Sequence, residues 1–369
     1  MPRPDPHIII SGGGTGGHIF PALAIARALK KKLPETQILF IGAKGKMEME
    51  KVPAAGFPIK GLWISGLKRE LSAKNLLFPF KVMHSLITAT CIIRRFKADV
   101  AVGVGGFASG PALRAAGMLG IPTLIQEQNS FPGITNKLLG KKASRICVAF
   151  EGMEKFFPSE KIIITGNPVR KEIIETEGKR GEAAAFFGLK TSKKTVFIVG
   201  GSQGAHSINI NIEKLLPLLK ENQVQLLWQT GRNFEQRAKE ACIKSGYEEA
   251  KVIGFIQRMD LAYALADIVI SRAGAIAIAE LAAVRKPVIF IPLPTATGDH
   301  QMKNARRLEE KEAALVITDR EVADKLPSLL LDLLKDEVSR KKLEKQIGIF
   351  AIVDADEKIA NEIIALIKK

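Results

Sequence analysis

The feature that most constrains this chain is an alternation of short apolar runs with longer stretches of helical pattern. Runs rich in β-branched residues occur in the first half near residues 7–10, 37–41, 100–104, 122–125 and 145–148. They begin again in the second half near residues 195–199, 225–229, 268–271 and 288–291. Strands joined by helices pair in parallel, because each helix returns the chain to the same end of the sheet. The sequence therefore predicts an α/β protein with two doubly wound parallel sheets.

Chain length and one proline-containing junction indicate where two domains meet. A chain of 369 residues exceeds the ~100–200 residues of a typical single domain. At Gly166-Asn167-Pro168, a glycine and a proline-restricted asparagine end one strand before a charged helix begins. We therefore expect an N-terminal domain at 1–167 and a C-terminal domain at 168–351. The amphipathic C-terminal segment, 352–369, can pack on either domain, and it can therefore return to the N-terminal domain.

Composition limits the cellular context. Cys91, Cys147 and Cys242 lie far apart, which excludes a disulfide framework or a cysteine-rich zinc site and indicates a reducing compartment. The first residues lack the apolar core of a secretory signal, and no uncharged apolar run approaches the ~20 residues of a membrane span. We therefore expect a cytosolic protein. Its formal net charge of +17 indicates an anionic partner, which can be nucleic acid, a membrane surface or a phosphorylated substrate.

Glycine-rich loops follow three of the predicted strands, at residues 11–18, 103–110 and 200–205. Backbone without side chains can approach an anion where a helix N-terminus presents unpaired N–H groups. The first loop also fits the dinucleotide fingerprint Gly-x-Gly-x-x-Gly, but the second strand is followed by Gly42, Ala43 and Lys44 in place of a ribose-binding acid. One such loop alone is equally consistent with a tight turn. Three together favour a phosphate-bearing ligand other than a dinucleotide, bound in a cleft between the two sheets.

Polar side chains near other strand ends suit a ligand with hydroxyl groups. Glu280 is the only acid in an otherwise apolar stretch, so its carboxylate either favours the helix dipole or accepts ligand hydroxyls. Gln301 and Asn129 carry amides, which can both donate to and accept from sugar hydroxyls. For Gln301 the alternative is a solvated helix start behind an aspartate cap.

Seven segments of the chain occur in an order that resembles a known family. They are Gly13–Ala24, Gly103–Pro111, Glu127–Asn129, Gly166–Arg170, Gly200–Ala205, Ser271–Glu280 and Asp299–Asn304. Together they resemble the MurG family of peptidoglycan N-acetylglucosaminyltransferases, over nearly the whole chain. The resemblance implies a GT-B fold with two Rossmann-like domains facing an interdomain cleft. It also implies inverting transfer of N-acetylglucosamine from UDP-N-acetylglucosamine to the C4 hydroxyl of the muramyl sugar in lipid I, forming lipid II without a metal or other cofactor.

The resemblance also assigns individual residues to the substrates. It implies that the transferred sugar and the diphosphate are contacted by Thr15, Gly16, Gly17 and Asn129. It places Arg170 and Ser202 at the nucleotide and its phosphates, and it gives Ala275 as a further substrate-binding position. It also places the backbone of Ile256 at uracil, Glu280 at the ribose hydroxyls and Gln301 at the sugar hydroxyls. At Ala277 the chain departs from the family pattern, which has threonine, so a hydroxyl contact to the diphosphate is lost there.

His18 is the candidate general base. An inverting displacement needs a group that takes the acceptor's proton, together with cationic or N–H groups that stabilise the departing diphosphate. A histidine titrates near neutral pH, and His18 ends the first glycine loop. The alternative is a histidine at a helix start that is hydrogen-bonded only to backbone.

A basic and apolar segment suits contact with a membrane. Residues 60–99 carry eight basic and two acidic side chains. The predicted membrane patch consists of Leu76, Leu77, Phe80, Lys68, Arg69, Lys74 and Lys81, next to a helix start at Pro79. Apolar residues surrounded by lysine and arginine suit an anionic bilayer surface. The alternative is a surface loop whose apolar residues fold back onto the domain.

We therefore expect a peripheral enzyme at the cytoplasmic face of the inner membrane, acting on UDP-N-acetylglucosamine and lipid I. One alternative is another UDP-sugar enzyme of this fold, such as a glycolipid glycosyltransferase or an epimerase. A second is a nonenzymatic basic protein that binds RNA or membrane. The second has little support, because aromatic residues make up only 6% of the chain and no basic stripe is interleaved with stacking rings. We therefore expect no nucleic-acid partner.

Overall fold

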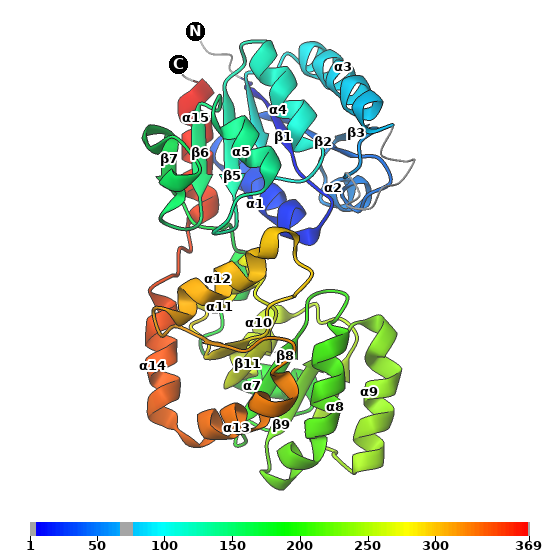
Figure 1. Ribbon diagram of the computed structural model, residues 1–369, viewed down its shortest axis with the longest axis vertical. Coiled ribbons are helices and arrows are strands. Elements are labelled where there is room, and N and C mark those ends of the chain that lie inside the picture. Colours follow the sequence, from blue (N-terminus) through cyan, green and yellow to red (C-terminus); the bar gives the residue numbers. More distant parts are fainter. Residues whose placement is uncertain (1–4, 67–76, 368–369) are drawn as a thin grey trace. The chain divides into compact units, whose positions relative to one another are not determined.

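The computed structural model describes residues 5–66 and 77–367. The chain divides into two compact units, one formed by Met1–Val169 with Asp354–Lys369 and the other by Arg170–Val353. Each unit contains a parallel sheet with helices on both faces (Figure 1), which confirms the predicted α/β class.

The first unit is built on a sheet whose seven described strands have the order β3-β2-β1-β4-β5-β6-β7. The strands are β1 His7–Ser11, β2 Gln37–Ala43, β3 Ile59–Leu62, β4 Val100–Gly103, β5 Thr123–Glu127, β6 Arg145–Val148 and β7 Ile162–Ile164. The helices are α1 Gly16–Lys32, α2 Glu48–Ala54, α3 Phe78–Phe96, α4 Ser109–Met118, α5 Ile134–Gly140 and α15 Ala355–Ile367, with 3-10 turns η2 Met153–Lys155 and η3 Ser159–Lys161.

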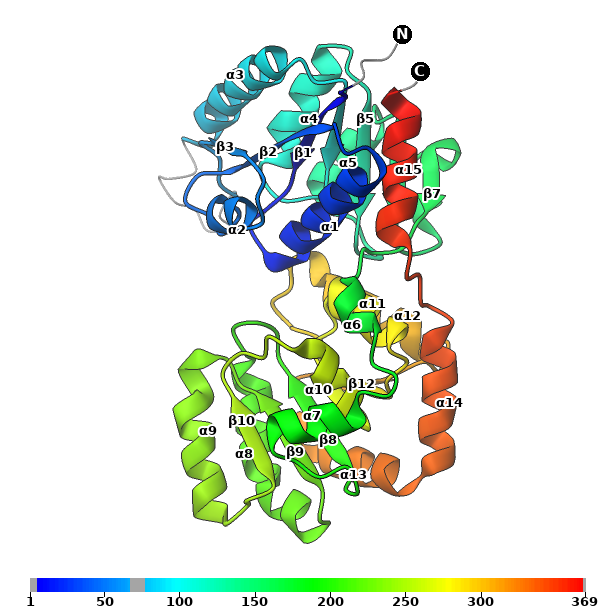
Figure 2. The same cartoon turned by 180° about the vertical axis from the view of Figure 1, so that it is seen from behind.

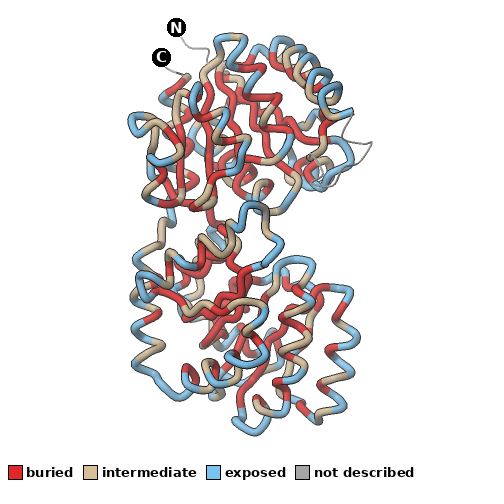
Figure 3. Tube along the Cα trace, viewed as in Figure 1, coloured by how far each residue is buried: buried red, intermediate tan, exposed pale blue. Residues whose placement is uncertain are grey.

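Both faces of this sheet are covered by helices, and its central strands contain consecutive apolar residues. In β1, Ile8 and Ile10 pack with α1, whereas Ile9 packs on the opposite face with α3 and α4. A parallel strand covered on both sides requires such a continuous apolar run. Figure 3 shows the strands as a buried layer inside more exposed helices.

The C-terminal segment packs on the first unit. Helix α15 lies beside α1 (Figure 2) and places Ile359 and Ile363 in the same core as Ile8 and Ile10. Both side chains are fully buried.

The second unit repeats the plan with six described strands in the order β10-β9-β8-β11-β12-β13. The strands are β8 Thr195–Val199, β9 Gln225–Gln229, β10 Ala250–Ile253, β11 Ile268–Ser271, β12 Val288–Phe290 and β13 Leu315–Val316. The helices are α6 Lys171–Ile174, α7 Arg180–Phe187, α8 His206–Glu221, α9 Arg232–Ser245, α10 Met259–Leu265, α11 Ala275–Ala283, α12 His300–Glu309, α13 Val322–Lys335 and α14 Glu337–Gly348, with the 3-10 turn η4 Thr297–Asp299.

The nine strands expected from the sequence are all present among the described residues. The strands that were not predicted are β3, β7, β10 and β13, and each lies at the edge of its described sheet. An edge strand pairs on one side only and is short, so few residues indicate it in the sequence.

Each sheet has one position at which the chain changes its direction of winding. In the first unit this position lies between β1 and β4, and in the second between β8 and β11. Open α/β sheets bind ligands at the carboxyl ends of the strands at such a position. The loops that follow these four strands are the three glycine-rich loops and the segment that begins at Arg272.

No helix within the described residues is both long enough and apolar enough to cross a membrane.

Candidate active site

The first glycine loop connects β1 to α1 and carries the predicted residues Thr15, Gly16, Gly17 and His18. Thr15 is the N-cap of α1, and its carbonyl accepts the N–H groups of His18 and Ile19 at 3.1 and 3.2 Å. Gly16 and Gly17 are the first residues of the helix, where N–H groups lack carbonyl partners within the helix. The loop therefore presents N–H groups and an imidazole at the same strand end.

The hydrogen bonds of His18 define which of its nitrogens carries a proton. Nδ1 lies 3.0 Å from the carbonyl oxygen of Gly13 and 3.3 Å from Oγ1 of Thr15. A carbonyl oxygen can only accept, so Nδ1 must be the donor to Gly13. In the neutral ring Nε2 then holds the lone pair, which is the form required of a general base.

Glu48, the first residue of α2, lies against the same loop. Its carboxylate accepts the N–H of Gly14 at 2.8 Å and the N–H of Ala43 at 3.0 Å. The residue is only 1% exposed. Sequence reasoning missed Glu48, because a single glutamate 34 residues after Gly14 gives no spacing signal.

The second glycine loop, which follows β4, packs directly on the first. A Cβ atom at Gly105 would lie 2.8 Å from Nε2 of His18, and one at Gly106 would lie 2.3 Å from the carbonyl oxygen of Gly13. Ser109 joins the two loops from α4, since its hydroxyl donates to the carbonyl of Ser11 at 2.8 Å. These glycines are therefore required for close packing around His18.

Asn129 is held by a buried carboxylate at the end of β5. Its N–H and its side-chain amide donate to Oε1 of Glu127 at 3.0 and 3.2 Å, and Asn136 donates to Oε2 at 2.8 Å. Burial raises the pKa of the Glu127 carboxyl, while hydrogen bonds from Asn129, Asn136 and Gly133 oppose the rise. Glu127 thus fixes the orientation of the predicted sugar-binding amide.

In the second unit, Ser202 is exposed in the glycine loop between β8 and α8. This loop packs on the loop after β9 so closely that a Cβ atom at Gly204 would lie 1.8 Å from the carbonyl oxygen of Thr230. Ala275 is the first residue of α11 and follows β11. The predicted substrate-binding positions Ser202 and Ala275 therefore lie at the two strand ends of the winding switch.

Glu280 lies on α11 and is paired with Arg170. Oε1 of Glu280 is 3.6 Å from Nη2 of Arg170, and Oε2 accepts the hydroxyl of Tyr263 at 3.1 Å. Burial raises the pKa of the Glu280 carboxyl, and the positive charge of Arg170 and the Tyr263 hydrogen bond oppose this rise. Glu280 is the sixth residue of α11, so the alternative of a charge at the helix start is wrong.

Ile256 and Gln301 each have one polar group already engaged. The N–H of Ile256 donates to Oε1 of Gln229 at 2.9 Å, so the predicted contact of its backbone with uracil falls to its carbonyl. Oε1 of Gln301 accepts the N–H of Leu293 at 2.9 Å, so its Nε2 group is the end that can donate to a sugar. Gln229 is a second residue that sequence reasoning missed.

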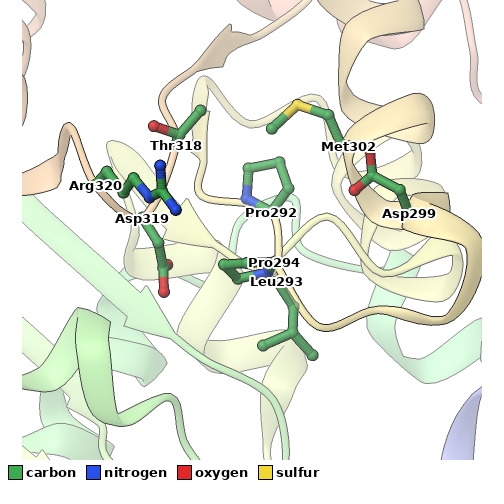
Figure 4. A pocket seen from close by; sticks show the side chains of 8 residues that line it. All are labelled: Pro292, Leu293, Pro294, Asp299, Met302, Thr318, Asp319 and Arg320. Carbon is green, nitrogen blue, oxygen red and sulfur yellow. The ribbon is translucent and has the colours of Figure 1, made fainter. Parts of the chain in front are cut away.

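A hollow of about 520 Å³ lies beside Gln301, at the ends of β12 and β13. Figure 4 shows Met302 extending from α12 over Pro292, opposite Thr318 and Asp319. Asp319 is paired with the buried guanidinium of Arg272. None of the predicted substrate residues lines the hollow, so it is a neighbour of the predicted donor site and contains no part of it.

The predicted membrane patch is described only in part. Lys68, Arg69, Lys74 and Leu76 lie outside the described residues. Leu77 and Phe80 are 49% and 70% exposed, and Met83 and Ile87 continue the exposed apolar surface along α3. Lys81 donates to Ser65 at 3.1 Å and lies 5.6 Å from the ring centroid of Trp63. Leu77 and Phe80 therefore do not fold back into the core, and the alternative of a folded-back loop is wrong for these two.

Within residues 5–66 and 77–367, no three histidine, cysteine, aspartate or glutamate side chains gather in a way that could hold a metal ion.

Comparison with protein families matches both halves of the chain. Residues 8–148 match the glycosyltransferase family 28 N-terminal domain, and residues 195–359 match the glycosyltransferase family 28 C-terminal domain.

Individual relatives cover almost the entire chain. A protein of Flavobacterium psychrophilum, named UDP-N-acetylglucosamine--N-acetylmuramyl-(pentapeptide) pyrophosphoryl-undecaprenol N-acetylglucosamine transferase, is 50% identical over 98% of this chain and 97% of its own length. A protein of Cytophaga hutchinsonii with the same name is 50% identical over 100% and 99%. The crystal structure of MurG from Acinetobacter baumannii has a TM-score of 0.80 at 28% identity and covers 98% of this chain and 99% of that one.

Proposed function

Because this chain belongs to glycosyltransferase family 28, we propose that it transfers N-acetylglucosamine from UDP-N-acetylglucosamine to the C4 hydroxyl of the muramyl sugar of lipid I. The product is lipid II, the precursor unit of peptidoglycan. The two doubly wound units are the domains of a GT-B glycosyltransferase. The observation that carries this function is the 50% sequence identity, over nearly the full chain, to proteins named as N-acetylglucosamine transferases that act on an N-acetylmuramyl-(pentapeptide) pyrophosphoryl-undecaprenol.

We propose His18 as the general base. The carbonyl of Gly13 holds the proton on Nδ1, so Nε2 can take the proton of the acceptor hydroxyl as that oxygen attacks the anomeric carbon. The bond from that carbon to the diphosphate breaks on the opposite side, which inverts its configuration. A general base typically contributes ~10² to 10⁴ in rate.

We propose that the second unit, Arg170–Val353, binds the donor. Glu280 accepts the ribose hydroxyls, and Arg170, held 3.6 Å from Glu280, provides positive charge for the diphosphate. The exposed loop at Ser202 and the helix start at Ala275 add N–H groups for the same phosphates. The carbonyl of Ile256 reads uracil, and the Nε2 group of Gln301 donates to the sugar.

We propose that the first unit binds lipid I and the membrane. Thr15, Gly16, Gly17 and Asn129 surround the reacting sugar and the diphosphate on the side of His18. The exposed apolar surface at Leu77 and Phe80 is the attachment to the anionic inner membrane, on its cytoplasmic face, where a lipid-linked acceptor resides.

The function is tested with purified protein, UDP-N-acetylglucosamine and a soluble lipid I analogue. We expect one UDP released per disaccharide formed, with the new linkage identified by mass spectrometry and NMR. We also expect an equal rate in EDTA, because Arg170 and loop N–H groups provide the stabilisation of the diphosphate. UDP-sugar turnover without any acceptor would identify an epimerase instead, and UDP release with other lipids but not with the analogue would identify a different glycosyltransferase.

A further inference from the structure

A single peptide group lies between a buried carboxylate and the imidazole of His18. The carbonyl of Gly13 and the N–H of Gly14 belong to the same peptide. Its carbonyl oxygen accepts from Nδ1 of His18 at 3.0 Å, and its N–H donates to Oε2 of Glu48 at 2.8 Å. Because the C=O and N–H of a trans peptide point in opposite directions, Glu48 and His18 contact this peptide from opposite sides.

The chain leaves space for this carboxylate at two glycines. A Cβ atom at Gly13 would lie 2.2 Å from Oε1 of Glu48, and a Cβ atom at Gly42 would lie 2.6 Å from its Cγ. Oε1 also accepts the N–H of Ala43, the last residue of β2, at 3.0 Å. Both oxygens thus accept N–H groups, as an ionised carboxylate does, and Glu48 is anchored to the sheet as well as to the loop.

Another glycine completes the enclosure of the same peptide. Gly106, from the loop after β4, lies so close that a Cβ atom there would be 2.3 Å from the carbonyl oxygen of Gly13 and 3.0 Å from its carbonyl carbon. The Gly13–Gly14 peptide is therefore constrained by the carboxylate of Glu48 on its N–H side and by backbone packing near its C=O side.

We propose that Glu48 is a positioning residue for His18 and acts through the Gly13–Gly14 peptide. The inference rests on the proposed function, in which His18 is the base. The charged hydrogen bond to the N–H fixes the direction of the Gly13 carbonyl and polarises the peptide, so that its oxygen becomes a stronger acceptor for Nδ1–H. Nε2 is thereby kept as the basic nitrogen and is held in one orientation. Glu48 touches no substrate in this role, and no proton leaves Nδ1.

The first experiment measures the tautomer of His18 directly. Protein labelled with ¹⁵N at histidine is examined by NMR above about pH 8, well above the ordinary pKa of a histidine. In the wild-type protein we expect the His18 signals of the Nδ1–H form. Wild-type signals of the Nε2–H form would overturn the proposal, whether or not any variant folds.

The second experiment compares Glu48→Gln with a matched control. Glutamine keeps the size of the side chain but replaces one accepting oxygen by an NH₂ donor, so it cannot accept both N–H groups. We expect the His18 signals to move toward a mixture of tautomers. We expect kcat to fall about 10- to 100-fold, while KM for UDP-N-acetylglucosamine stays within about a factor of two.

The control is Asp99→Asn in the same unit. The Asp99 carboxylate also accepts a backbone N–H, that of His7 at 2.7 Å, but at the opposite end of β1 from the loop. This variant should leave both the His18 signals and kcat unchanged.

The two experiments separate this inference from the proposed function. Unchanged His18 signals in Glu48→Gln would overturn the positioning role. A shifted tautomer supports it whatever the rate does, and a shifted tautomer with an unchanged kcat would count against His18 as the base, which is the proposed function.

Discussion

At the scale of single residues, groups with proposed roles are held by buried side chains that are near or far in the sequence. Glu127, at the end of β5, orients the nearby Asn129, whereas Gln229 accepts the N–H of the distant Ile256 and Tyr263 donates to Glu280. Each partner is buried, so each hydrogen bond forms away from competing water. Substitutions of these partners should therefore change the site without altering a residue that contacts substrate.

Replacing His18 by alanine tests the base. Removing the imidazole removes the acceptor for the hydroxyl proton, so we expect kcat to fall by ~10² to 10⁴. Donor affinity should hardly change, because no contact with the donor is proposed for His18 itself. Steady-state kinetics with the lipid I analogue and calorimetry with UDP-N-acetylglucosamine measure the two quantities. A wild-type kcat at saturating acceptor would remove His18 from the mechanism.

We expect donor binding to depend on pH through the carboxyl group of Glu280. Burial raises the pKa of its carboxyl, so it takes up a proton at higher pH than an exposed glutamate would. The protonated group cannot accept two ribose hydroxyls, and donor affinity should therefore be full above this pKa and fall as the pH drops through it. In Tyr263→Phe the charged form loses a hydrogen bond, so the fall should begin at higher pH.

Calorimetric titrations between about pH 5 and pH 8 measure this dependence. Glu280→Gln serves as the reference that cannot titrate, and its donor affinity should be weak and independent of pH. Identical pH profiles for the wild type and Glu280→Gln would show that Glu280 does not bind the ribose.

At the scale of elements, α3 packs one face on the sheet and exposes large apolar side chains on another. Ser85, Ala89 and Ile93 are buried against the sheet, while Phe80, Met83 and Ile87 are exposed on the same helix. Leu77 and Lys81 lie at the start of the same helix, so several exposed apolar side chains gather beside a basic residue. Such a grouped apolar surface suits contact with a bilayer for an enzyme whose acceptor is a lipid.

Replacing Leu77, Phe80 and Ile87 together by serine should detach the protein from anionic vesicles. Each apolar side chain contributes up to ~1.5 to 3 kcal/mol if it is fully buried in the bilayer, whereas a nearby basic residue contributes ~1 kcal/mol. High salt should therefore release the wild-type protein only in part. Sedimentation with vesicles measures binding, and UDP-N-acetylglucosamine binding verifies the fold.

The matched control is Ile243→Ser with Val338→Ser. The side chains of Ile243 and Val338 are each 79% exposed, and both residues lie in the second unit. Vesicle binding should survive in this double variant. Equal sedimentation of the triple variant and the wild type would contradict a membrane role for α3.

At the scale of the whole molecule, the chain leaves the first unit at Val169 and returns to it at Asp354. Helix α15 then covers part of the sheet face that carries α1. The first unit is therefore incomplete until the last residues of the chain are in place. A change in α15 should weaken the first unit, although the second unit separates the two in sequence.

The substitution Ile363→Ala tests whether the packing of α15 stabilises the first unit. Ile363 is fully buried, so its truncation should cost about 2 to 5 kcal/mol of stability. Hydrogen exchange followed by mass spectrometry should show faster exchange in β1 and β4, with β8 and β11 unchanged. Ile349→Ala, at a position 70% exposed, should leave both units at wild-type rates. Faster exchange confined to the second unit would contradict the packing of α15.

The sequence alone determined the inner strands, because a parallel strand buried on both faces must be apolar at nearly every position, as in Ile8-Ile9-Ile10. Strand β7, Ile162-Ile163-Ile164, has the same composition, but three residues are too few to distinguish a strand from any other apolar segment. The glycine loops were predictable as well, since close backbone approach requires glycine at fixed positions after a strand.

Only the tertiary structure decided which residues support the site. His18 was visible at the end of a glycine loop, but its tautomer depends on the direction of the Gly13 carbonyl. Glu48 and Tyr263 reach their partners through folding, and no local pattern marks them. The amphipathic pattern of α15 likewise showed that one of its faces is buried, but it did not identify the partner. An apolar stripe fits any complementary surface, so only the packed fold assigns α15 to α1.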